Sequence, residues 1–161
     1  MTSTARSPTE HRERDYYEWL LETARAVRSG AWDQLDQDAL AEELEDMGRS
    51  ERRAVRSHLV ALLVHLLKWH YQSDQRSQSW RASISNARVA IGFVLEDSPS
   101  LNSDMPSYLP KAYEKARRAA ADETGLPQST FPKRCPWRLG LILTQDPSAL
   151  RPQSAGDDPR A

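Results

Sequence analysis

The sequence predicts an all-α fold, a single-domain bundle of four to five helices built around one long central helix. Three observations predict this class. Apolar residues recur at steps of three and four, which is the spacing of one helix face. No proline occurs between Pro8 and Pro99, so a helix can run over residues 37–72, with Gly48 as its one weak point. No run alternates between apolar and polar residues as a half-buried strand does.

The first expected helix begins near residue 14 and ends at Gly30, because glycine readily adopts the left-handed conformation that ends many helices. Before it, residues 1–13 are polar and are expected to form a mobile N-terminal arm. After it, Asp33 and Asp36 are candidate N-caps for the second helix. The apolar face of the first helix contains Tyr16, Trp19, Leu20, Thr23 and Val27.

The second expected helix, residues 37–72, is the dominant feature. Residues 42–56 are charged around most of the circumference, whereas residues 59–71 are apolar almost all round. A helix that is apolar on every side is normally buried on every side. We therefore expect either a central helix in the bundle or a helix partly covered by a second subunit. Its main stripe contains Leu40, Leu44, Met47, Glu51, Val55, His58, Leu62, His65 and Trp69.

Two further helices and a short last one complete the domain, residues 14–144. The third is expected over 77–95 and the fourth over 106–123, where it ends at Gly125. A short helix is expected within 137–143, and residues 145–161, with three prolines and little apolar surface, are expected to be disordered. The core faces of the third and fourth helices contain Trp80, Ile84, Ala87, Ile91, Leu95, Leu109, Ala112, Tyr113, Ala116 and Ala120.

Composition excludes several classes of protein. The 161 residues suit one domain, and a net charge of −1 argues against a dedicated non-specific DNA-binding protein. The longest apolar run, residues 59–67, is about half a membrane span. Cys135 is the only cysteine, so a disulfide framework within the chain is excluded. No secretory signal is visible, and we expect a cytoplasmic protein without a membrane anchor.

Seven short motifs occur in order along the chain. They are DYYEWL at 15–20, EELEDMGRSER at 42–52, HLLKW at 65–69, SWR at 79–81, EDSPSL at 96–101, ETGL at 123–126 and FPKRCP at 131–136. Together they resemble the DUF29 family of bacterial proteins. The resemblance implies a helical domain of unknown function, and it implies no activity and no catalytic residue. One departure, two prolines within 105–110, leaves the start of the fourth helix open.

The histidines are the first candidate site. His58 and His65 are seven residues apart and share a helix face with Glu51. A metal site would need a further ligand from another helix or from a partner subunit. The favoured interpretation is core or interface histidines bonded to carboxylates, with no cofactor.

The charged block of the second helix is the next candidate. Glu45 and Arg49 form an i,i+4 pair and Asp46 and Arg49 an i,i+3 pair. A solvated, salt-bridged face is the simplest interpretation. Alternatively, some acids face inward and pair with arginines of the third helix, Arg81 or Arg88, because buried charges need partners. The candidates for this polar network are Glu42, Glu43, Glu45, Asp46 and Arg49.

One cluster combines basic and aromatic residues: Arg76, Trp80, Arg81 and Arg88. Arginine suits phosphate and tryptophan can stack on a base, so the cluster is a candidate for anion or nucleic-acid binding. Trp80, however, falls on the core face of its helix. Cys135 has cations beside it but no nearby histidine to act as a base, so a packed thiol is expected.

The sequence therefore favours a non-enzymatic helical interaction or regulatory module. It would act through helix–helix association, as a homodimer or with an unidentified protein partner. The alternatives are a nucleic-acid or anion-binding protein using the Arg76 cluster, and a metal-binding bundle using His58 and His65.

Overall fold

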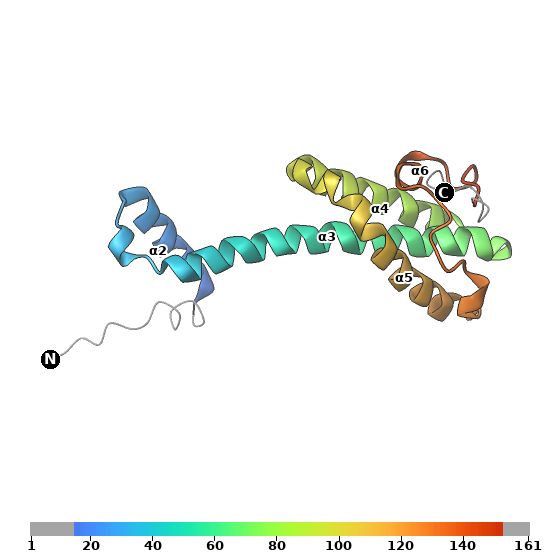
Figure 1. Ribbon diagram of the computed structural model, residues 1–161, viewed down its shortest axis with the longest axis horizontal. Helices are drawn as coiled ribbons and strands as arrows, with labels where there is room; N and C mark the ends of the chain where they lie inside the picture. Colours follow the sequence, from blue (N-terminus) through green and yellow to red (C-terminus); the bar gives the residue numbers. More distant parts are fainter. Residues whose placement is uncertain (1–14, 153–161) are drawn as a thin grey trace, which may run out of the picture. The chain divides into compact units, whose positions relative to one another are not determined.

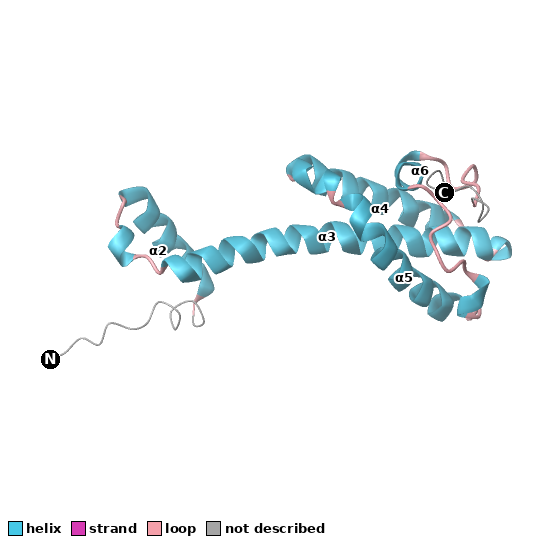
Figure 2. Cartoon of the chain, viewed as in Figure 1, coloured by secondary structure: helices cyan, strands magenta, loops and turns pink. Residues whose placement is uncertain are grey.

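The structure, a computed structural model, describes residues 15–152, and all regular elements in that range are helical (Figure 2). The all-α class and the long helix predicted over 37–72 are confirmed. The α-helices are α2 (Tyr16–Ser29), α3 (Gln37–Tyr71), α4 (Gln78–Asp97), α5 (Met105–Thr124) and α6 (Leu139–Thr144) (Figure 1). Short 3₁₀ helices lie between them: η1 (Trp32–Gln34), η2 (Ser73–Gln75), η3 (Pro99–Ser103) and η4 (Gln128–Thr130).

The described residues divide into two compact units, and the division lies within α3, between Ser50 and Glu51. The first unit contains α2, η1 and the beginning of α3. The second contains the rest of α3 with α4, α5 and α6. None of the helices between residues 15 and 152 is long and apolar enough to cross a membrane. The mobile arm predicted for residues 1–13 lies outside the described residues.

In the first unit, side-chain caps and a glycine set the helix ends. Asp15 accepts a hydrogen bond from the backbone N–H of Glu18 at 2.9 Å, so it is the N-cap of α2. Gly30 ends α2 with φ 70°, as predicted. Of the two candidate caps for α3, Asp36 accepts from the N–H of Ala39 at 2.9 Å, whereas Asp33 lies within η1.

The predicted core stripe is wrong at the beginning of α3. Leu44 and Met47 are 60% and 59% exposed, whereas Ala39 and Glu43 are buried. The buried face is rotated from the predicted one by roughly a quarter of a turn. The reason is tertiary: α2 contributes Trp19 to this small interior, and α2 also supplies the hydroxyl that binds Glu43.

In the second unit, the apolar segment of α3 is the centre of the core. Leu59, Leu62, Leu63, Leu66 and Leu67 are all completely buried. Helices of the same chain cover this segment, so it no longer requires a second subunit. The predicted faces of α4 and α5 are confirmed: the core cluster includes Ile84, Ala87, Ile91, Ala112, Tyr113, Ala116 and Ala120.

The prolines near the start of α5 do not delay the helix, which begins at Met105 with a buried side chain. Pro106 lies in the first turn, where a backbone N–H has no partner within the helix. Pro110 is accommodated inside α5 on the exposed side. At the other end, Gly125 has φ 69° and ends the helix where the sequence predicted.

The chain beyond α6 corrects the predicted boundary at residue 144. Leu150 is 1% exposed and belongs to the core cluster. Asp146 pairs with Arg81 of α4. The prediction of disorder from residue 145 is therefore wrong for residues 145–152, because one leucine and one aspartate find partners in the fold. Residues 153–161 lie outside the described residues.

Candidate functional site

The residues of the basic and aromatic cluster have partners within the second unit. The Nε of Arg76 donates to the carbonyl of Trp69 at 2.7 Å, and its guanidinium lies over the Trp69 ring. Arg81 forms an ion pair with Asp146. The Trp80 ring packs against the core and lies 4.8 Å from the Lys68 ammonium.

Arg88, the fourth member, binds the end of α6. Its Nε and Nη2 atoms donate to the carbonyls of Ile142 and Gln145 at 2.9 and 2.6 Å. Burial lowers the pKa of Arg88, although Asp146 opposes this effect. The two carbonyl oxygens therefore occupy hydrogen-bonding positions of the guanidinium that a bound phosphate would need. The contacts of Arg81 and Arg88 join α4 to α6 and to the residues that follow it.

The two candidate histidines of α3 are both half-buried. The Nδ1 atom of His65 lies 2.9 Å from the carbonyl oxygen of Ala61 on the same helix. Glu51 is exposed. Between residues 15 and 152, no group of three or more His, Cys, Asp or Glu side chains has an arrangement that could hold a metal ion.

The charged block separates into one buried acid and a solvated face. The two expected pairs of Arg49 are present, at 3.1 Å to Glu45 and 2.6 Å to Asp46. Hydrogen bonds from Arg49 to Asp46 and Glu45 raise the pKa of the guanidinium. Glu43 is buried and accepts a hydrogen bond from the hydroxyl of Tyr16. Glu42 is exposed.

The predicted pairing of inward-facing acids of this block with Arg81 or Arg88 is not observed among the described residues. Glu43 does face inward, but its described partner is a phenol of α2. Arg81 and Arg88 bind Asp146 and backbone carbonyls instead. Sequence spacing could not reveal the role of Tyr16, because the contact joins residues 27 positions apart.

Cys135 is a packed thiol. It is half-buried beside the core and its Sγ donates to the carbonyl of Trp137 at 3.4 Å. Burial raises its pKa to about 11, and the contact with Trp137 lowers it only in part. A nucleophilic cysteine needs the opposite shift, because the thiolate is the reactive form.

Iodoacetamide is therefore expected to alkylate native Cys135 at pH 8 about a hundredfold more slowly than it alkylates the chain unfolded in urea. A pKa raised by two pH units leaves about one hundredth of the thiolate. The measurement is the alkylation rate between pH 7 and 11 by mass spectrometry. The native rate should still be rising at pH 10. A plateau near pH 9 would contradict the raised pKa, whereas slow access alone would not move the profile.

The first unit has an apolar surface of its own on α3, which we name the α3 stripe: Leu40, Leu44 and Met47. Leu40 is half-buried, and the other two side chains are mostly exposed. Steps of four and three residues place all three on one face of the helix. On α2, Tyr17 and Leu21 are also exposed. The sequence predicted that these three residues share one apolar face of the helix, but it did not predict that Leu44 and Met47 lie outside the core.

Comparison with known proteins identifies a family but no characterised relative. No curated protein and no solved structure matches the chain significantly. The family model described as "Domain of unknown function DUF29" matches residues 12–147, which include the described part of the first unit and most of the second. The motifs, the helical architecture and this match agree, and the chain belongs to the DUF29 family.

Proposed function

We propose that this chain is a non-enzymatic helical interaction module that pairs with a second copy of itself through the α3 stripe. The observation that carries the proposal is the exposure of Leu44 and Met47 on one face of α3, beside the half-buried Leu40. Large apolar side chains grouped on one exposed helix face are typical of association surfaces.

The first unit gains from such pairing because its own apolar interior is small. Among residues 15–50, the buried apolar side chains are Trp19 and Ala39. Covering Leu44 and Met47 in both copies would remove four large side chains from water. Burying a fully exposed side chain of this size contributes about 1.5–3 kcal/mol, and these side chains, which are about 60% exposed, would gain a corresponding fraction of it. Part of this gain is offset by the loss of translational and rotational freedom on association.

The α3 stripe has a self-complementary register when two copies run antiparallel. In such a two-fold pair, Leu44 would lie opposite Met47 of the partner subunit, so the same two apolar side chains provide both halves of the contact.

The spacing of the α3 stripe fits this kind of contact. Intervals of four and three residues are those of the apolar seam in a pair of supercoiled helices. A two-fold pair uses the same surface on both copies, so one stripe provides both sides of the interface. We propose in addition that the protein is bacterial, as the resemblance to the DUF29 family implies, and that it is cytoplasmic. The single cysteine, which has no partner for a disulfide within the chain, favours a cytoplasmic location.

The test compares two glutamate double variants of the full chain by analytical ultracentrifugation. In L44E/M47E the dimer should dissociate at tens of micromolar, with a dissociation constant raised at least a hundredfold. The matched control is V89E/F93E, which changes two α4 residues of similar exposure, 52% and 62%. This control should sediment as the unchanged protein does, because those residues lie outside the α3 stripe.

Circular dichroism should show the same helix content for both variants. A monomeric unchanged protein at tens of micromolar would overturn the proposal. Equal loss of the dimer in the control variant would also overturn it, because it would move the interface away from the α3 stripe.

A further inference from the structure

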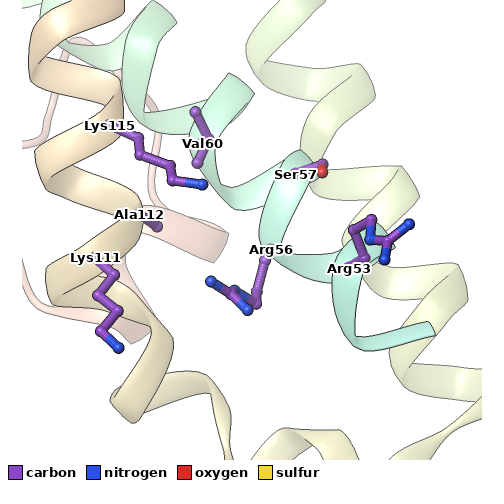
Figure 3. A pocket seen from close by; sticks show the side chains of 7 residues that line it. All are labelled: Arg53, Arg56, Ser57, Val60, Lys111, Ala112 and Lys115. Carbon is purple, nitrogen blue, oxygen red and sulfur yellow. The ribbon is translucent and has the colours of Figure 1, made fainter. Parts of the chain in front are cut away.

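The second unit contains a groove of about 520 Å³ between α3 and α5 (Figure 3). Successive turns of α3 provide Arg53, Arg56, Ser57 and Val60, and α5 provides Lys111, Ala112 and Lys115. Steps of three and four residues place each set on one helix face. In Figure 3, the side chains of Lys115 and Arg56 reach from α5 and α3 toward the space between the helices. Four of the seven lining residues are cations and none is an acid.

These four cations have no ion pair with a described residue, whereas three other cations of the unit have carboxylate partners. Lys68 pairs with Glu123, Arg81 with Asp146 and Arg118 with Glu114. Arg53, Arg56, Lys111 and Lys115 form no ion pair within residues 15–152. Glu114, which lies between the two lysines in sequence, has Arg118 as its partner. The chain as a whole has a net charge of −1, so the positive charge here is local.

The geometry points to a binding site for a compact anion with two or more neighbouring phosphate groups, such as the polyphosphate part of a nucleotide or free inorganic polyphosphate. Like charges facing one space repel each other unless counter-charge is present. Phosphate provides that charge together with acceptor oxygens for guanidinium and ammonium groups. A single phosphate group, with a charge of about −1.5 to −2 at pH 7, would leave about half of the charge of these four cations unmatched.

The lining also indicates how such a ligand would be held. Arg56 is positioned by Tyr108, whose ring centre lies 5.7 Å below the guanidinium. The Tyr108 hydroxyl is itself fixed by a hydrogen bond to Asp104 at 3.1 Å. The exposed hydroxyl of Ser57 can donate to a phosphate oxygen. Val60 and Ala112 are apolar and more buried, so the polar contacts come from the rim.

The size of the groove favours a small ligand over a long nucleic acid. A volume of about 520 Å³ is within the range of about 300–1,000 Å³ for small-molecule sites. Nucleic-acid surfaces present a longer track of cations, which neutralise phosphates along the backbone. Here four cations line one space between two helices, and Arg56 and Lys115 reach into it (Figure 3). The lining also lacks an aromatic ring on which an unstacked base could lie.

The experiment is a titration of the full chain with sodium tripolyphosphate by isothermal calorimetry. Inorganic phosphate, ATP and a single-stranded oligonucleotide are the comparison probes. We expect 1:1 binding of tripolyphosphate, at least tenfold tighter than phosphate and weakened by salt. K111Q/K115Q should weaken it at least tenfold. The charge-matched control R25Q/R28Q, in α2, should change it less than twofold.

The probes separate the two sources of the same chemistry. Equal affinity for ATP and tripolyphosphate assigns binding to the phosphates alone, and tighter binding of ATP assigns a nucleotide; both support the site. Tripolyphosphate binding no tighter than phosphate would overturn it, as would equal loss in R25Q/R28Q. Preferential binding of the oligonucleotide, with a steep salt dependence, would replace it with a nucleic-acid surface. L44E/M47E should bind tripolyphosphate normally, so this inference stands or fails separately from dimerisation.

Discussion

Leu63→Ala is expected to lower the free energy of unfolding by about 2–5 kcal/mol, the range for leucine-to-alanine changes in a packed core. Leu63 is completely buried in the middle of the apolar segment of α3. Alanine removes buried methyl groups and leaves a cavity, because close-packed neighbours move only partly into the space. The measurement is urea unfolding followed by circular dichroism. Since domains are stable by only about 5–15 kcal/mol, this one change removes a large fraction of the total.

The matched control for this change is Leu21→Ala. Leu21 is 40% exposed on α2, so the same chemical change creates no enclosed cavity. Its effect on the free energy of unfolding should be below about 1 kcal/mol, as for most surface substitutions. Comparable losses for the two variants would show that the apolar segment of α3 is not the tightly packed centre described above.

Arg88→Ala is expected to lower the free energy of unfolding by about 3 kcal/mol, since hydrogen bonds to charged groups contribute about 1.5–3 kcal/mol each. The guanidinium donates to the carbonyls of Ile142 and Gln145, at the end of α6. A helix of six residues has too few internal bonds to persist alone. In the Arg88→Ala variant, the amide hydrogens of the segment from α6 to Leu150 should exchange faster than they do in the unchanged protein. The increase should be larger there than in the other helices of the second unit.

Arg81→Ala provides the comparison for Arg88. Arg81 pairs with Asp146, but both side chains are almost half exposed. Exposed ion pairs contribute about 0–1 kcal/mol, so this variant should be nearly as stable as the unchanged protein. If Arg81→Ala loosened the segment after α6 as much as Arg88→Ala, the ion pair and not the carbonyl contacts would hold that segment.

Local signals in the sequence determined the helices, because caps, glycines and periodicity act through neighbouring residues. Asp15 begins α2 as its N-cap, and Gly30 and Gly125 end α2 and α5. Each of these residues acts only on the helical turn beside it. The faces of α4 and α5 were also predictable, since the apolar residues of those helices define one face. The continuity of α3 followed from the absence of proline over residues 37–72.

Only the tertiary structure decided which face of a helix is covered and which charges are paired. At the beginning of α3, packing with α2 buries Ala39 and Glu43 and leaves Leu44 and Met47 exposed. The cations at 53 and 56 of α3 lie more than 50 positions before those at 111 and 115 of α5, so no local signal predicts that they line one groove. Conversely, the sequence made Arg88 a candidate for anion binding, but in the fold its guanidinium donates to the carbonyl oxygens of Ile142 and Gln145. Periodicity acts within one helix, whereas burial and charge pairing depend on which helix lies opposite.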